Sequence, residues 1–549
     1  MNCRRSFALL ICLSLFTLVG CKKDTPQEVT PVEIAPEPTA VVAEPYGDML
    51  VQAAIGEPLN LIPAIAHDSA SHDVASLVYN GLVTADKDLN LKGDLAESWQ
   101  VSDDGLTIVF NLRKDVKWHD GTPFTARDVL FTYKFMIDED TPTSYAGDFL
   151  AVSSVVALDE YTVEVKYPRP HAPSLVSWSM WIMPAHLLEG VSPTKSSLQR
   201  NPIGTGPYIF ESWEPNQRLT LKANPDYYEG RPHTERIVFR FLQDQSAAFL
   251  ELLKGGVDLM DLTPAQYAKQ TDTDRFKSQY NTYNYLSSTY AYIGYNLTRK
   301  PFDDVRVRKA LSYATPRQQI IDSVLYGMGT PATGPYKPGT AWHNPNVATY
   351  NYDIEKAKAL LAEAGWALND KGVLTKDKKP FKIELLTNQS TTRVQIAEIV
   401  QASWKELGIE VTIRVTEWGA FIKEHVEKRN FDATILAWNI VLDPDPIDVW
   451  HSKSCTDKNV LNFICYRNAE ADKLMEDALL SFDPAVRKAY YDRFQEILAE
   501  EQPYTFLYVP QELVAISSRF KAVEPAAAGL THNIIDWYVP EDEQKYKNR

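Results

Sequence analysis

Three aspartates follow a strand-like run in the stretch DATILAWNIVLDPDPIDVW, residues 432–450. The spacing of Asp443, Asp445 and Asp448 partly resembles a calcium-binding loop, in which carboxylates recur as ligands. Prolines separate these acids, and such a loop needs glycine at its sixth position, where this run has Asp448. We therefore expect no metal here. The acids follow the end of a buried strand, which is where α/β proteins hold ligands.

Two histidine–aspartate pairs, His67-Asp68 and His72-Asp73, also offer metal-ligand side chains. Such residues more often cap the junction between a loop and a helix, and we expect that role here. The sequence has no G-x-S-x-G, Walker A, H-E-x-x-H or C-x-x-C motif. We therefore expect no catalytic residue, no metal and no cofactor, and we do not expect an enzyme.

Five cysteines are present, and three of them belong to the N-terminal leader. Cys455 and Cys465 remain, ten residues apart in a polar stretch. An even pair in an exported protein predicts a disulfide. Free thiols and a metal site are the alternatives, and His451 is the only histidine close to the pair in sequence.

The N-terminus has the pattern of a bacterial lipoprotein leader. Arg4 and Arg5 precede an apolar run, 7–19, that is too short for a stable membrane span. The run ends in Leu-Val-Gly-Cys, which resembles a lipobox with Cys21 as the lipidated residue; an ordinary secretory signal is the alternative. We predict a signal peptide over 1–20 and a mature lipoprotein in the periplasmic space or cell envelope, anchored to a membrane by its acyl chains.

Composition narrows the class of protein further. The stretch KKDTPQEVTPVEIAPEPTAVVAEPY is rich in proline and acids, which predicts a disordered tether over 21–47. Loss of residues 1–20 removes two arginines and no acid, so the formal charge moves from −16 to −18. Nucleic-acid phosphates repel so acidic a chain, and we expect no nucleic-acid partner.

Residues 290–500 alternate strand and helix signals. Strands are predicted at 382–387, 409–415 and 432–438, with helices at 393–407 and about 419–429 between them. This order implies right-handed crossovers and a largely parallel sheet. Thr315, Pro316 and Gln318 have the pattern of an N-cap, a first-turn proline and a capping-box residue for a further helix.

Several stretches of the sequence are informative when they are taken together and in order, although each one alone is a weak signal. They are YNGL (79–82), DLAESWQVSDDGLTIVFNLRKDVKWHDGTPFTARDVLFTY (94–133), PIGTGPYIFESW (202–213), NPDYYEG (224–230), YIGYNLTRKPFDDVRVRKALSYA (292–314) and KAKALLAEAGW (356–366). In this order they resemble the family 5 extracellular solute-binding proteins, which include the oligopeptide- and dipeptide-binding proteins of ABC importers. By themselves the stretches are turns, caps and strand starts, so they identify a scaffold and not a ligand.

The resemblance implies an α/β fold of the periplasmic-binding-protein type II kind, with two lobes joined by a two-strand hinge and an additional smaller domain. The expected limits are 48–75, 200–288 and 505–540 for a discontinuous lobe I, 76–199 for the smaller domain and 289–504 for lobe II. Ligand would be enclosed between the lobes as they close. The expected partners are a solute, an ABC permease and its ATPase subunits, and the expected state is a monomer.

The resemblance also suggests which residues face the ligand. They are Ser69, Ala70, Tyr145, Asp261, Trp418, Trp438, Asn439, Asp443 and Tyr508; core packing is the alternative for the aromatic ones. In peptide-binding relatives, an acid three residues after the matching tryptophan pairs with the peptide amine, but here that position is Val441. Asp443 is the first acid, so it needs a ligand cation, a protein cation or water, unless it caps an exposed turn.

Three functions are compatible with these observations. The first is a lipid-anchored receptor of an ABC importer that captures peptides, with oligopeptides expected, or a non-peptide solute such as a sugar oligomer. The second is an exported hydrolase, which would need a nucleophile or paired catalytic carboxylates. The third is a sensor or chaperone-like binding module on the same scaffold.

Overall fold

The computed structural model describes residues 45–440, 443–456 and 461–546. The predicted signal peptide, Cys21 and nearly all of the predicted tether lie outside these residues. In the part of the chain that is described, no helix is both long enough and apolar enough to cross a membrane.

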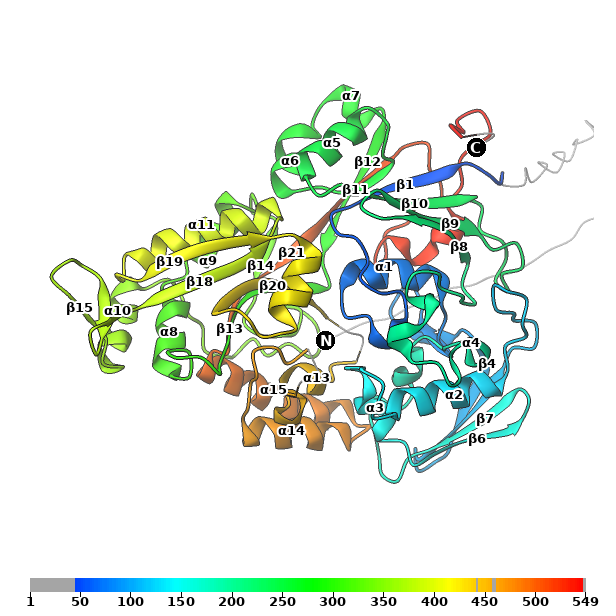
Figure 1. The fold of residues 1–549 in the computed structure, drawn as a ribbon, viewed down its shortest axis with the longest axis horizontal. Coiled ribbons are helices and arrows are strands. Elements are labelled where there is room, and N and C mark those ends of the chain that lie inside the picture. The colour runs from blue at the N-terminus through cyan, green and yellow to red at the C-terminus, as the bar shows by residue number, and fades with distance from the viewer. Residues whose placement is uncertain (1–44, 441–442, 457–460, 547–549) are drawn as a thin grey trace, which may run out of the picture. The chain divides into compact units, whose positions relative to one another are not determined.

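Within the described residues, a mixed sheet of twelve strands forms the framework of the fold (Figure 1). Ten strands follow one another in the order β19 (Glu410–Thr416), β18 (Lys382–Asn388), β20 (Ala433–Asn439), β13 (Thr289–Tyr295), β21 (Tyr504–Ser517), β11 (Leu259–Asp261), β1 (Met49–Ala54), β10 (Arg236–Phe241), β9 (Arg218–Ala223) and β8 (Tyr208–Glu214). The strands β12 (Tyr280–Leu286) and β14 (Gly329–Pro331) also pair with β21.

The prediction of a largely parallel sheet for residues 290–500 is only partly right. β18 pairs in parallel with β19 and β20, as the strand–helix alternation requires. β13 joins β20 and β21 in antiparallel pairs, however. β12 and β13 follow each other directly, without a crossover helix between them. The chain therefore runs from one side of the hinge to the other as one nearly continuous extended segment.

β21 connects the two sides of the fold. Its first part, Tyr504 to Tyr508, pairs with β13, and its second part, Gln511 to Ser517, pairs with β12. The path from β12 to β13 makes the same passage through Ser287 and Ser288. Two strand segments therefore form the hinge, and the expected fold class of two lobes plus a smaller domain is confirmed. The expected domain limits stay a prediction.

Helices surround the strands that lie on the second side of the hinge, in the expected lobe II. α11 (Thr391–Lys405) lies over β18 and β19 (Figure 1), starting two residues before its predicted beginning. The helix predicted at 419–429 is a single turn, α12 (Trp418–Ala420), followed by π-helical residues Phe421–Val426. Helices α8 (Val305–Tyr313), α10 (Ile354–Glu363), α14 (Ala469–Leu479) and α15 (Pro484–Glu501) complete this side.

The predicted N-cap of α9 (Arg317–Ser323) is wrong. Pro316 occupies the N-cap position, without a side-chain cap. The Thr315 hydroxyl instead donates to the Leu311 carbonyl oxygen at 2.7 Å. The preceding helix, α8, ends at this point, so the hydroxyl satisfies a carbonyl at its C-terminus rather than an amide of the next helix.

The region predicted as the smaller domain contains a separate antiparallel sheet. Its strands are β4 (Ala96–Val101), β5 (Thr107–Leu112), β7 (Thr162–Lys166) and β6 (Ser154–Asp159). A helix, α2 (Ala126–Ile137), begins at a capping box formed by Thr125 and Asp128. The other helices mentioned below are α1 (Ser69–Val78), α3 (Ala146–Leu150), α5 (Gln245–Leu253) and α13 (Ile447–Trp450).

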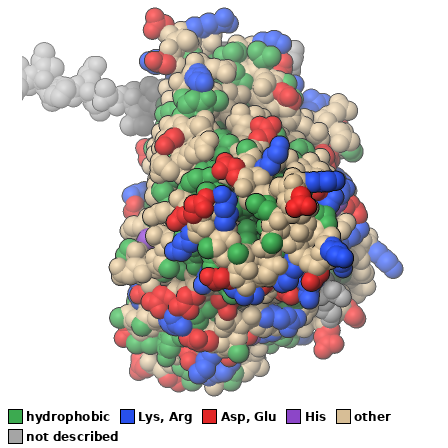
Figure 2. Space-filling model, turned by 90° about the vertical axis from the view of Figure 1, so that its left-hand side faces the viewer, with side chains coloured by type: hydrophobic (Ala, Val, Ile, Leu, Met, Phe, Trp, Pro, Cys, Tyr) green, Lys and Arg blue, Asp and Glu red, His purple; other side chains and the backbone are tan. Residues whose placement is uncertain are grey.

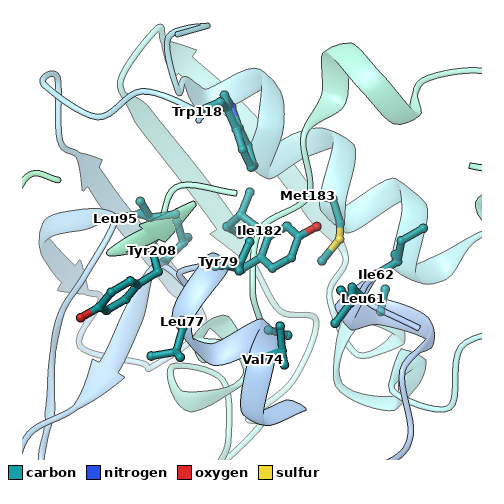
Figure 3. Packing of buried hydrophobic residues seen from close by; sticks show 14 of the residues in the cluster. Leu61, Ile62, Val74, Leu77, Tyr79, Leu95, Trp118, Ile182, Met183 and Tyr208 are labelled. Carbon is teal, nitrogen blue, oxygen red and sulfur yellow. The ribbon is translucent and has the colours of Figure 1, made fainter. Parts of the chain in front are cut away.

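Apolar side chains from distant segments form the core around α1. Leu61, Val74, Tyr79, Trp118 and Met183 belong to one buried cluster, and Figure 3 shows Tyr79 in its middle, near Met183. This packing stabilises the part of the fold around α1, since burial of such side chains contributes about 1.5–3 kcal/mol each. On the face shown in Figure 2, acidic and basic side chains are interspersed.

Candidate ligand-binding site

Residues from the two sides of the hinge contact one another. The Gln389 side-chain amide donates to the Ile55 carbonyl oxygen at 3.3 Å. At another point, the Ala172 N–H donates to the Leu479 carbonyl oxygen at 2.7 Å. The two sides of the hinge are therefore in contact, which is a closed arrangement. The candidate site is the boundary where they meet.

Trp438 and Asn439 end β20, as predicted for the stretch that opened the sequence analysis. The Trp438 indole N–H donates to the Tyr504 hydroxyl at 3.1 Å, and its ring stacks on Tyr292 at 6.5 Å between centroids. Trp438 stays half-buried, and Asn439 is exposed beside Thr289. One side of Trp438 is therefore fixed by aromatic packing while part of its surface remains open to a ligand.

Asp443 has a protein cation as its partner. Both terminal nitrogens of Arg487 donate to its carboxylate, at 3.0 and 2.6 Å. Burial lowers the pKa of Arg487, but the hydrogen bond to Asp443 and the negative charge of that residue raise it by more. The net shift is upward, so the guanidinium stays charged. The guanidinium also lies over the rings of Trp342 and Tyr491. Of the alternatives considered for Asp443, the structure contains the internal ion pair.

Two other acids of the same loop meet an acid from the smaller sheet's side. A side-chain carbon added at Gly147 would lie 3.3 Å from Asp448 Oδ1, so α3 and α13 touch at this point (Figure 1). Burial, and secondly the charge of Asp148, raises the pKa of Asp448 to about 7, although Lys453 opposes the shift. The same two causes raise the pKa of Asp445 well above its usual value. Closure therefore brings carboxylates together.

Ser69 and Ala70 form the first turn of α1 and Tyr145 faces the loop before it. Asp68 caps this helix by accepting from the Ser71 N–H at 3.0 Å, which is the role expected for it. The Tyr145 hydroxyl donates to the Ala66 carbonyl oxygen at 2.9 Å. Ser69 is exposed and Ala70 is half-buried. The structure thus places these three predicted residues together at one end of α1.

The imidazole of His67 is half-buried in the same place. Burial, and secondly the charge of His72, lowers the pKa of His67 to about 4, so it is neutral near pH 7. Its Nδ1 has no hydrogen-bond partner among the described residues. In the described ranges no cluster of three or more histidine, cysteine, aspartate or glutamate side chains is arranged to hold a metal ion.

Asp261 belongs to a second group of acids. Its side chain is exposed at the lobe boundary, but the surrounding protein limits its hydration. This poor hydration, followed by the negative charges of Glu512 and Asp73, raises the pKa of Asp261 to about 7. Asp73 is likewise exposed but crowded by protein, and poor hydration, then the charges of Asp68 and Glu512, raises its pKa to about 7 as well. A cation, Lys337, lies near these acids, and its ammonium donates to the Leu286 carbonyl oxygen at 2.7 Å. Burial lowers the pKa of Lys337, and the negative charge of Glu512 opposes this shift.

Trp418 and Tyr508 reach the boundary from different elements. An added side-chain carbon at Gly56 would lie 2.8 Å from the Trp418 ring, so this tryptophan packs directly against the first lobe. Its Nε1 has no partner among the described residues. Tyr508 lies in the middle of β21, opposite Ala291 on β13 and Pro331 on β14. Both residues therefore line the region that the hinge strands bring together.

The structure pairs Cys455 and Cys465 in a disulfide, as predicted, with their Cα atoms 4.9 Å apart. It also shows charged residues at the boundary that the sequence analysis missed: Lys337, Arg393, Arg487 and Glu512. Their signal was weak, because each is a single charged residue in an ordinary helix, strand or loop. Only the unpaired Asp443 indicated that a cation such as Arg487 must lie nearby.

The hinge, the closed lobes and the aromatic boundary define a two-lobed solute-binding protein. The family described as bacterial extracellular solute-binding proteins, family 5, matches residues 90–460, and the chain belongs to this family. The chain is 34% identical to the oligopeptide-binding protein AppA of Bacillus subtilis over 505 residues, which are 90% of this chain and 92% of AppA.

Solved structures agree with this assignment. The structure of Bacillus subtilis AppA in complex with a nonapeptide has a TM-score of 0.86 and 33% identity, and the match covers 91% of this chain and all of that one. NikZ of Campylobacter jejuni in complex with Ni(L-His) has a TM-score of 0.82 and 29% identity, covering 89% and 99% of the two chains. Heme-binding protein A of Haemophilus influenzae is 29% identical over 506 residues, 87% of this chain and 88% of its own.

Proposed function

We propose that this chain is the lipid-anchored, peptide-binding component of an ABC importer, and that its ligands are oligopeptides held between the two lobes. The observation that carries this proposal is its likeness to AppA, which was solved with a nonapeptide and which this chain matches over 91% of its length. The half-buried Trp438 and the buried Trp418 and Tyr508 offer the large rigid surfaces that suit extended ligands of varied sequence.

The pairing of Asp443 supports a ligand without an essential amine at this point. A bidentate guanidinium already satisfies the carboxylate, so an ammonium group would have to displace Arg487. N-terminally blocked and free peptides should therefore bind similarly. Oligopeptides fit this condition better than dipeptides, whose two charged ends form a large part of what a receptor can recognise.

The remaining partners follow from the same proposal. Acyl chains on Cys21 would hold the protein at a membrane of the cell envelope, and the segment 21–47 would let the lobes reach the permease. The permease and its ATPase subunits would drive uptake after the loaded protein docks. Loss of peptide uptake on deletion of the gene would distinguish an importer from a sensor on the same scaffold.

Native mass spectrometry of the purified protein with a mixed pool of nonapeptides tests the binding proposal. Intact peptides bound at one per chain are the expected result. Cleaved peptides in the pool would instead reveal a hydrolase, and a co-purified sugar or other solute with no peptide bound would favour a non-peptide ligand. Thermal unfolding with and without the pool provides a second measurement, since ligands that bind only the folded state raise the melting temperature.

A further inference from the structure

The turn between α14 and α15 touches the smaller sheet at two points. A side-chain carbon added at Gly105, in the turn between β4 and β5, would lie 2.5 Å from the Phe482 ring. Three residues before Phe482, the Leu479 carbonyl oxygen accepts from the Ala172 N–H at 2.7 Å. One apolar contact and one backbone hydrogen bond therefore join these two parts of the fold.

The two partners of this contact belong to different sides of the hinge. α14 and α15 lie on the second side, with β13 and β20. Ile108 of β5 belongs to the same buried cluster as Leu50 of β1 and Leu219 of β9, so the smaller sheet is packed on the first side. The contact between the turn and the smaller sheet therefore exists only while the two sides are closed upon each other.

This contact is remote from the hinge. In Figure 1, α14 lies at the bottom of the view, whereas α5 and β12 lie near its top. Near α5 the two sides also touch, because the Thr391 N–H donates to Gln245 Oε1 at 3.0 Å. When lobes rotate about a hinge, the points farthest from it separate most. The lower contact must therefore break when the lobes open.

The turn itself holds Phe482 at its tip. Asp483 caps α15 by accepting from the Ala485 N–H at 2.8 Å, and its own N–H donates to Ser481 Oγ at 3.2 Å. Phe482 is 47% exposed even with the contact in place. The core of α14 and α15 therefore does not account for a phenylalanine at this position, whereas the contact with Gly105 does.

Gly105 provides the space that the ring occupies. Its φ of +70° is one that glycine adopts at little cost, and its N–H closes the turn by donating to the Ser102 carbonyl oxygen at 2.8 Å. A side chain at Gly105 would enter the space of the Phe482 ring. The position thus combines a turn conformation with a requirement for an empty surface.

The hydrogen bond completes the end of a helix. The last carbonyl groups of a helix have no partner within it. Leu479 is the last residue of α14, and its carbonyl oxygen receives the Ala172 N–H from the other side of the boundary. On opening, water must replace both this bond and the apolar contact, which is a modest net cost.

We infer that the turn between α14 and α15 is a latch, in which Phe482 at Gly105 and Leu479 at Ala172 stabilise the closed lobes without touching the ligand. An interaction made only in the closed state raises the affinity for any ligand that closes the lobes. The inference rests on the proposed function. It gives a peptide receptor a share of its affinity that is the same for every peptide sequence.

Titration calorimetry of Phe482→Ala tests the latch, with three nonapeptides of different sequence recovered from the mixed pool. The affinity for all three should fall by the same factor, about 3- to 10-fold. The peptide-free variant should melt at the wild-type temperature, because its open lobes do not make the contact. Tyr352→Ala is the matched control: Tyr352 is also 47% exposed on the second side but contacts Ser403, and the affinities should not change.

Gly105→Asn tests the other half of the contact. Asparagine tolerates a positive φ, so the turn can persist while the new side chain meets the Phe482 ring. The three affinities should fall by a common factor, about 3- to 10-fold, and adding this change to Phe482→Ala should cost little more. Gly190→Asn is the matched control, since Gly190 has a φ of +75° and an added side-chain carbon there would meet no atom within 4 Å.

Three results would overturn the inference while leaving the proposed function intact. The first is wild-type affinity of Phe482→Ala for all three peptides. The second is a loss that differs among the peptides, since Phe482 would then contact the ligand. The third is a melting temperature that falls as much without peptide as with it, which would give Phe482 a structural role only. Failure of the wild type to bind any peptide would overturn the proposed function, and with it a latch for peptide capture.

Discussion

The carboxylate of Asp443 is held by both terminal nitrogens of Arg487, 44 residues later in the chain, with side-chain exposures of 16% and 8%. The pair joins the loop after β20 to α15. Two charges in so little water are stable only while both are present, because removal of one leaves the other buried and unpaired. The pair therefore fixes this loop internally and is unavailable to a ligand amine.

Asp443→Asn should lower the free energy of unfolding by about 3–5 kcal/mol, measured by urea denaturation. Arg487→Gln should have a similar cost, and the double variant should be less destabilised than the sum of the two single variants. The affinity ratio between free and N-acetylated nonapeptides should not change. A ratio that collapses in Asp443→Asn alone would show that this carboxylate recognises the ligand amine after all.

Trp438→Ala should weaken peptide binding by about 2–4 kcal/mol, because the ring is fixed by Tyr504 and Tyr292 while part of it stays open at the boundary. Trp366→Ala is the matched control, since Trp366 is also half-buried in the second lobe but stacks on Phe381 at 4.6 Å. Titration calorimetry on both variants compares them. Wild-type affinity in Trp438→Ala would remove β20 from the binding site.

Sequence reasoning succeeded mostly where the signal is local, although the local N-cap prediction at Thr315 was wrong. Asp68 lies next to the helix that it caps, as expected, and the disulfide needs only two cysteines in one loop. It failed where partners are distant. Nothing near Asp443 identifies Arg487, and the antiparallel placement of β13 depends on a hinge strand, β21, some two hundred residues later. The family resemblance supplied the lobes, but not the charges at their boundary.

The Cys455–Cys465 disulfide should contribute about 2–3 kcal/mol to stability by restricting the unfolded chain, given a loop of about ten residues. The double variant Cys455→Ser with Cys465→Ser should lose this amount in urea denaturation. Thiol labelling of the denatured, unreduced wild type should detect neither cysteine. Two reactive thiols before reduction would contradict the pairing.

Cys21→Ser should release the protein from the membrane fraction without altering peptide affinity, since the anchor is separated from the lobes by the predicted tether. Cys12→Ser, within the apolar run of the leader, is the control and should leave the protein in the membrane fraction. Immunoblots of fractionated cells would record both outcomes. A Cys21→Ser protein that still sediments with membranes would point to a different anchor.

Peptide affinity should fall as the pH rises from about 5 to about 7 and then level off. Closure raises the pKa of Asp448 from its usual value to about 7 through burial and the charge of Asp148, with Lys453 opposing. An acid with a raised pKa in the closed state binds its proton more tightly there than in the open state. Closing is therefore unpenalised below the ordinary pKa, costs progressively more between the two pKa values, and costs a constant amount above the higher one.

Titration calorimetry from pH 5 to pH 8 measures this dependence, with an N-acetylated nonapeptide that has a free C-terminus and no titrating side chain. Asp448→Asn should flatten the profile and raise the affinity at pH 8, because the amide carries no charge at any pH. Asp370→Asn, at an exposed turn far along the chain from this loop, should reproduce the wild-type profile. A profile in Asp448→Asn as steep as that of the wild type would assign the dependence to the other acids at the boundary, Asp73 and Asp261, whose pKa values are also raised to about 7.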